Sequence, residues 1–172
     1  MLSKAPKRAS KFFIKNNRRY NGNDREIDKF KCAPRTAYNQ WTQFEEFPRF
    51  MGGVEEVRQL DDKRAHWRTN IGGKEKEFDT EITEQIPDKR IAWRSLAGAS
   101  HAGVVTFHAL NDQQTRIMLQ MEYEPEGMVE NAADALGILS RRIEKDLERF
   151  KEFIESHRSE TGAWRGRIER NV

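Results

Sequence analysis

Six segments with the alternation of β-strands follow one another in the middle of the chain, and short turn signals separate them. In the clearest of them, Thr115–Tyr123, apolar residues alternate with a more polar set, which is typical of an antiparallel sheet with one face on a core. The Gly72-Gly73 pair predicts a hairpin, because both positions accept a positive φ. The six expected strands are Val54–Leu60, Arg64–Ile71, Glu75–Ile86, Ile91–Ser95, Gly103–Leu110 and Thr115–Tyr123.

A long amphipathic helix is expected after the strands, from about Met128 to His157. Its apolar residues recur at steps of three and four and form one stripe. They are Val129, Ala132, Leu136, Leu139, Ile143, Leu147, Phe150 and Ile154. Two short helices are predicted before the strands, one from Pro34 to Trp41 and one at a Thr-x-x-Glu capping pattern that begins at Thr42. These elements predict an α+β fold, in which a curved antiparallel sheet of six to seven strands wraps around the long helix.

Composition divides the chain into three regions, residues 1–24, 25–157 and 158–172. The first carries a charge of +6 and lacks strand or helix periodicity. We interpret it as a basic arm, which is either a flexible, solvated tail or a segment that contacts an anionic membrane. The second is the folded domain, with a weakly patterned first strand in Arg25–Cys32. The third is a C-terminal tail around Trp164.

Composition also excludes several classes of protein. No apolar run approaches the ~20 residues of a membrane span, and the N-terminus lacks the apolar core of a signal peptide. The single cysteine, Cys32, fits a reducing compartment, so we expect a cytoplasmic protein, with peripheral membrane contact as the alternative. Outside the arm the net charge is −3, and no specific nucleic-acid partner is expected.

The sequence shows no catalytic constellation. None of the four histidines has a partner at metal-ligand spacing, and no nucleophile or phosphate-loop motif occurs. We therefore expect no metal, no cofactor and no catalytic residue. His66 and His108 alternate with apolar neighbours, which places both on the outer face of the sheet.

The inner faces of the expected sheet and helices carry large apolar side chains. Most of these fill a core, but a strongly curved sheet around one helix also leaves room for an apolar pocket with a few polar groups. Thr69, Thr80, Ser95 and Tyr123 are the polar candidates. Gly137, within the helix stripe, indicates either close packing or room for a ligand. The candidate cavity residues are Trp41, Phe50, Trp67, Phe78, Ile82, Trp93, Val105, Phe107, Leu119, Met121, Leu136 and Ile143.

These segments resemble the START-like superfamily of helix-grip proteins, also described as polyketide cyclase/dehydrase or SRPBCC proteins, and in particular its coenzyme Q-binding-like bacterial branch. The resemblance covers about residues 25–157. The family's first strand alternates apolar residues, whereas here Lys29 and Lys31 flank Phe30. The segments that carry the resemblance are Tyr38–Met51, Gly53–Val57, Trp67, Gly72-Gly73, Glu81–Pro87, Ile91–Ser95, Gly103–Phe107, Tyr123–Gly127 and the long helix.

The resemblance implies a pocket for a hydrophobic small molecule such as a lipid, a quinone or a polyketide-like compound. Binding or carriage of that molecule is our first hypothesis. A cyclase or dehydrase activity on a polyketide-like substrate is the second. The third is an interaction module that acts through the basic arm and the Trp164 tail.

Overall fold

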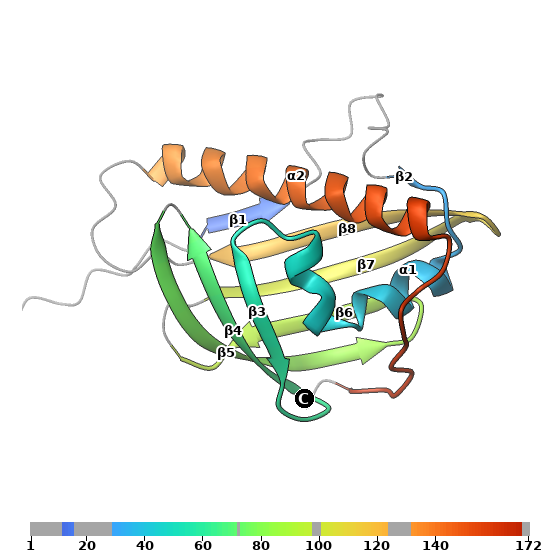
Figure 1. The fold of residues 1–172 in the computed structure, drawn as a ribbon, viewed down its shortest axis with the longest axis horizontal. Helices are drawn as coiled ribbons and strands as arrows, with labels where there is room; N and C mark the ends of the chain where they lie inside the picture. The colour runs from blue at the N-terminus through green and yellow to red at the C-terminus, as the bar shows by residue number, and fades with distance from the viewer. Residues whose placement is uncertain (1–11, 16–28, 72, 98–100, 124–131, 170–172) are drawn as a thin grey trace, which may run out of the picture.

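The computed structural model describes residues 12–15, 29–71, 73–97, 101–123 and 132–169. Within them, one antiparallel sheet curves around the long helix α2 (Ala132–His157), as Figure 1 shows. The strand order is β1-β8-β7-β6-β5-β4-β3, and β2 also pairs with β8. This arrangement confirms the predicted α+β helix-grip fold. The strands are β1 (Phe12–Lys15), β2 (Lys29–Phe30), β3 (Val54–Gln59), β4 (Arg64–Ile71), β5 (Lys74–Ile86), β6 (Arg90–Ser95), β7 (His101–Asn111) and β8 (Gln114–Tyr123).

Strand β1 corrects the interpretation of residues 1–24 as an arm without regular structure. Phe12–Lys15 pairs antiparallel with β8, with Phe12 opposite Tyr123. Its aromatic and β-branched residues favour a strand, but four residues are too few for an alternation to be recognised. The rest of the arm lies outside the described residues. Of the strand predicted in Arg25–Cys32, the described part contains only the two residues of β2.

The hairpin predicted at Gly72-Gly73 joins β4 to β5, with Ile71 opposite Lys74. Gly73 has a φ of 78°, a left-handed conformation that glycine adopts at no steric cost. Trp67 and Phe78 are cross-strand partners, and their rings stack with centroids 6.2 Å apart. The predicted register of these two strands is therefore confirmed.

A β-bulge between Ile82 and Glu84 interrupts the pairing of β5 with β6. The extra residue turns Gln85, rather than Glu84, toward the interior. Gln85 is 2% exposed, and its amide nitrogen donates to the Tyr38 hydroxyl over 3.0 Å. The bulge thus links the far end of β5 to the short helix α1 (Pro34–Trp41).

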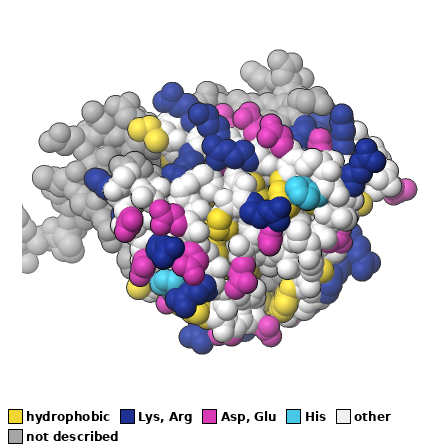
Figure 2. Space-filling view, viewed as in Figure 1, with side chains coloured by type: hydrophobic (Ala, Val, Ile, Leu, Met, Phe, Trp, Pro, Cys, Tyr) yellow, Lys and Arg dark blue, Asp and Glu magenta, His cyan; other side chains and the backbone are white. Residues whose placement is uncertain are grey.

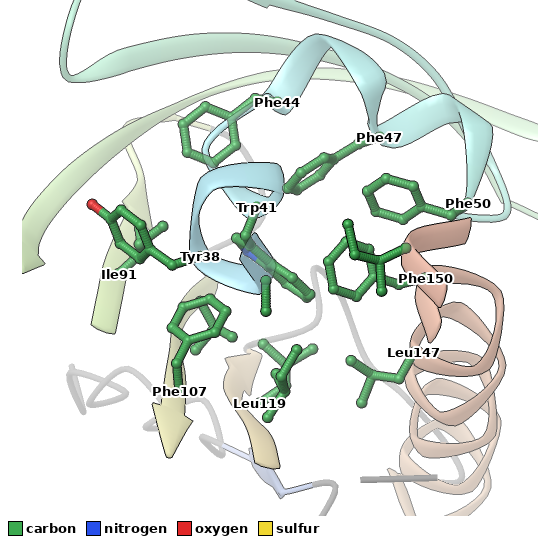
Figure 3. Close-up of a cluster of buried hydrophobic side chains, with 14 of the residues drawn as sticks. Tyr38, Trp41, Phe44, Phe47, Phe50, Ile91, Phe107, Leu119, Leu147 and Phe150 are labelled. Carbon is green, nitrogen blue, oxygen red and sulfur yellow. The ribbon is translucent and has the colours of Figure 1, made fainter. Parts of the chain in front are cut away.

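Aromatic rings fill one end of the concave side of the sheet, where α1, the 3-10 helix η2 (Phe44–Arg49) and the end of α2 meet (Figure 3). Trp41 packs edge-on against Phe150 with centroids 5.0 Å apart, and Phe50 lies 4.9 Å from the same ring. Phe107 of β7 approaches from the sheet. Each such ring pair adds roughly 0.5–1.5 kcal/mol beyond the area it buries. We call this region the filled end.

The described part of the C-terminal tail, residues 158–169, packs on the domain. The side-chain amide of Gln40 accepts the Thr161 N–H over 2.9 Å and donates to the Thr161 hydroxyl over 3.1 Å. Ile168 is 6% exposed and forms an isolated β-bridge with β5. The few apolar residues of the tail are too sparse to show a strand pattern, so the burial of Ile168 could not be predicted from the sequence.

Candidate functional site

An apolar cavity of about 190 Å³ lies between the concave face of the sheet and the middle of α2, beside the filled end. Each strand from β3 to β8 contributes to its wall, as do α1 and η2. Its described lining consists of Trp41, Phe44, Phe47, Met51, Val54, Ala65, Trp67, Thr69, Phe78, Thr80, Ile82, Trp93, His101, Leu119, Met121, Leu139, Arg142, Ile143, Asp146 and Leu147.

Eight of the twelve cavity residues predicted from the sequence lie on this wall. They are Trp41, Trp67, Phe78, Ile82, Trp93, Leu119, Met121 and Ile143. The side chain of a ninth, Leu136, lies outside the described residues. That any of them binds a ligand stays a prediction.

The other three predicted residues belong to the filled end and not to the cavity wall. Val105 and Phe107 lie on β7 beneath α1, where Phe107 contacts the ring of Tyr38 at 5.7 Å. Phe50 follows η2 and packs between Phe150 and Phe153. All three are at most 5% exposed, because rings from the helices occupy the space that the sequence left open for a ligand.

The structure adds residues that sequence reasoning missed. Phe44, Phe47 and Met51 come from η2 and the turn after it, and their aromatic-rich segment was a visible signal. Arg142 and Asp146 were passed over because they are charged, although each adjoins the apolar stripe of α2. Examining the edges of that stripe as well as its centre would have found them.

Asp146 connects α2 to the turn before β3. Its Oδ1 accepts the Gly52 N–H over 2.9 Å and Arg149 Nη1 over 3.1 Å, while its Oδ2 lies 3.9 Å from Arg142 Nε. Burial raises the pKa of the Asp146 carboxyl, against the opposing effects of the Gly52 N–H and the two guanidinium groups. The carboxylate is therefore held in place by a backbone donor as well as by charge.

Gly53 is the position at which the backbone makes room for this arrangement. Its φ is 77°, which disfavours any residue with a side chain. A β-carbon built on Gly53 would also collide with the guanidinium of Arg142. The same carbon would lie 2.6 Å from the Asn70 carbonyl oxygen, so glycine is required at this turn by its backbone conformation and by its close neighbours.

The uncharged polar groups of the wall bond within the sheet. Trp67 Nε1 donates to Thr80 Oγ1 over 2.8 Å, and Thr69 Oγ1 donates to the Lys76 carbonyl over 3.3 Å. Of the other two polar candidates, Ser95 is not part of the described lining, and the Tyr123 side chain lies outside the described residues. His101 is on the wall, with its ring edge-to-face with Phe78 at 4.8 Å.

The outer face of the sheet differs from the cavity in chemistry. His66 lies there and its Nδ1 is 2.7 Å from Asp79 Oδ1, while His108 is exposed, as predicted for both histidines. A wider hollow of about 570 Å³ on this face is bordered by charged residues such as Arg94 and Glu81. Charged side chains are scattered over the face of the molecule that Figure 2 shows. An apolar ligand would gain less by binding there than in the cavity.

The described part of the chain contains neither a metal-ligand cluster nor a membrane-spanning helix. No three His, Cys, Asp or Glu side chains in it are grouped as metal ligands would be. None of the helices described combines the length and the apolar character needed to cross a membrane.

The chain is similar in sequence to a known protein family and to a curated relative. Residues 31–152 match the family model described as polyketide cyclase / dehydrase and lipid transport. An uncharacterized 17.2 kDa protein in the melC2-rnhH intergenic region of Streptomyces lincolnensis is 56% identical over 134 residues, which span 77% of this chain and 89% of that protein.

Two solved structures with lower identity share the fold. A START superfamily protein from Mycobacterium smegmatis is 12% identical with a TM-score of 0.66, over 84% of this chain and 98% of its own. The Zhui aromatase/cyclase from Streptomyces sp. R1128 is 10% identical with a TM-score of 0.66, over 90% of this chain and 99% of its own. At these identities the likeness extends to the fold alone.

Proposed function

Because the chain belongs to the polyketide cyclase/dehydrase and lipid transport family, in the START-like superfamily, we propose that its cavity binds a hydrophobic small molecule for carriage or protection. The observation that carries this proposal is the apolar wall around space that core residues leave unfilled. Transfer of apolar ligand surface from water to such a wall gains about 25 cal/mol per Å². Carriage needs no chemistry beyond this binding.

The volume of the cavity limits the size of the ligand. An apolar protein cavity of about 150 Å³ takes up benzene, so about 190 Å³ suits a compact ring system. A quinone with an isoprenoid tail, a diacyl lipid or an extended polyketide would require the cavity to enlarge. We therefore propose a compact ligand, or the compact end of a larger one.

Tryptophan fluorescence tests binding directly. Three of the four tryptophans line the cavity, and Trp164 in the tail does not. In a Trp164→Phe background, emission therefore comes from the three cavity tryptophans, of which Trp93 also borders the outer hollow. An apolar quinone such as 1,4-naphthoquinone should quench it with a saturating curve.

A matched pair of variants separates binding in the cavity from adsorption elsewhere. Ala65→Leu adds bulk to the cavity wall and should weaken quenching at least about tenfold, because overpacking removes the space. Ala102→Leu makes the same change beside the outer hollow and should leave quenching unchanged. Equal quenching of both variants, or none in the parent, would contradict a binding role.

A cyclase or dehydrase activity is the second candidate, favoured by two polar residues of the cavity lining, His101 from β7 and Asp146 from α2. Histidine is the usual general acid or base near neutral pH. An enzyme should convert a poly-β-ketone substrate to a product lighter by one water, and His101→Gln should abolish this while leaving ligand binding intact. Absence of any product with the parent protein favours carriage.

If the ligand is lipid-like, it would enter from a membrane, and we propose that residues 1–24 contact an anionic membrane surface. Each basic residue near an anionic bilayer adds about 1 kcal/mol of attraction. Deleting the arm would also remove β1, so the better variant replaces Lys4, Lys7, Arg8, Arg18 and Arg19 with Gln. The parent should co-sediment with anionic vesicles at low salt and this variant should not.

A further inference from the structure

The charges on the cavity wall come from α2, apart from any on His101 of β7. Arg142 and Asp146 line the cavity one helical turn apart, whereas Arg149 pairs with the same carboxylate but is not part of the described lining. Asp146 Oδ1 already accepts two short hydrogen bonds, from Gly52 and Arg149. In the described part of the chain, the ion pair of Arg142 is the longer contact of 3.9 Å to Oδ2.

Two guanidinium groups share the Asp146 carboxylate, and only one of them, that of Arg142, lines the cavity. The Arg142 side chain is 24% exposed, half the value for Arg149 at 48%. Guanidinium carries five N–H donors, and a partly buried cation is stabilised most by an anion that it can bond. The wall therefore offers a cationic donor next to an apolar hollow.

We propose that Arg142 anchors the acidic group of the ligand, so that the cavity selects compact aromatic carboxylic acids over neutral molecules of the same shape. The inference rests on the proposed function and specifies its ligand class. The stacked rings of Trp67 and Phe78 provide a flat apolar surface for the ligand ring. The planar guanidinium matches the two oxygens of a carboxylate.

The test compares 2-naphthoate with 2-naphthamide, which have nearly the same shape and differ in charge. Isothermal titration calorimetry at pH 7 should show at least about tenfold tighter binding of the acid, the gain expected from a charge-assisted hydrogen bond. Arg142→Gln should abolish this preference while changing the affinity for the amide by less than about twofold. Arg142→Lys should keep part of it, because lysine retains the charge without the fork of donors.

Arg149→Gln is the matched control. It removes a guanidinium that pairs with the same carboxylate but does not line the cavity, so it should preserve the preference for the acid. Thermal unfolding of each variant shows whether it is folded.

Equal binding of acid and amide by the parent overturns the inference and leaves the proposed function standing. A preference that survives in Arg142→Gln overturns it too, since another group must then select the acid. If neither probe binds while naphthoquinone still quenches the cavity tryptophans, the inference fails alone. If quenching is also absent, the proposed function fails with it.

Discussion

The filled end and the cavity are built by the same strands and the same helix, yet one is solid and the other hollow. On β8, Ile117 belongs to the filled end and Met121 to the cavity wall; on α2, Phe150 belongs to the first and Leu139 to the second. The difference comes from α1 and η2, whose rings occupy one end of the concave side (Figure 3). An apolar inner face thus makes a core only where another element brings side chains to fill it.

The largest expected effect contrasts the two regions along α2. Phe150→Ala should lower the free energy of unfolding by about 3–5 kcal/mol, because it leaves a void among closely packed rings. Leu139→Ala should lower it by only about 1 kcal/mol, because Leu139 is partly buried and already borders empty space. Urea denaturation followed by circular dichroism measures both values.

These two variants also differ in their expected effect on binding. Leu139→Ala should change naphthoquinone affinity, whereas Phe150→Ala, where it remains folded, should alter it less. Similar losses of stability at the two positions would mean that the cavity is packed in solution, and the comparison would fail.

A second prediction concerns the glycine that brings Arg142 to the β3 turn. Gly53→Ala should cost about 1–2 kcal/mol for a left-handed backbone and roughly 1–3 kcal/mol more because its β-carbon collides with the Asn70 carbonyl and with Arg142. Gly73→Ala is the matched control, since its φ of 78° is nearly the same and no atom lies within 4 Å of the added carbon. In denaturant unfolding, Gly73→Ala should lower the free energy of unfolding only by the cost of the left-handed backbone.

The difference between the two glycine variants reports the contacts of the added carbon with the Asn70 carbonyl and with Arg142 together. Equal losses of stability would mean that both the β3 turn and Arg142 adapt to the added carbon at no cost. A larger loss for Gly53→Ala, together with weaker discrimination between naphthoate and naphthamide, would connect the contact with Arg142 to ligand selection.

Much of the fold could be predicted, because period-2 alternation and turn residues are local properties. The pairing of Trp67 with Phe78 follows from a hairpin at Gly72-Gly73 and from nothing distant in the sequence. Strand β1 and the burial of Ile168 could not be predicted, because each depends on one short segment that meets a distant strand. The β-bulge that turns Gln85 inward could not be predicted either, because it interrupts the alternation of apolar and polar residues.

The sequence could not show which inner-face residues pack in the filled end and which line the cavity, and the reason is different. Phe107 and Trp93 are both apolar inner-face residues with the same alternation around them. Only the positions of Tyr38 and Trp41, set by α1, decide that Phe107 is covered. Arg142 was missed because a charged residue at the edge of an apolar stripe is usually solvated.

The smallest expected effects concern two carboxylates, one in each region. Asp146, at the cavity, has a pKa raised by burial, whereas Asp88, near the filled end, has a pKa lowered chiefly by its hydrogen bonds from Arg165 at 2.6 and 2.8 Å. Protonated Asp146 is favoured by folding, so its contribution to stability declines as pH rises from the ordinary carboxyl pKa of 3.8 through the raised value. Ionised Asp88 is favoured by folding, so its contribution is complete above that ordinary pKa and is lost as pH falls through the lowered value.

Asparagine variants should therefore respond to pH with opposite signs. Relative to the parent, Asp146→Asn should become more stable as pH rises across the raised window, because it avoids burial of a charge while its side-chain oxygen still accepts the Gly52 N–H. Asp88→Asn should become less stable relative to the parent as pH rises, because only the parent gains the ionised pair with Arg165. Unfolding midpoints measured from pH 3 to pH 7 give both differences. The same sign for both would show that the Asp146 carboxylate is solvated and charge-compensated like a surface carboxylate. The environment of its partner Arg142 would then be too solvated for that guanidinium to select an acidic ligand.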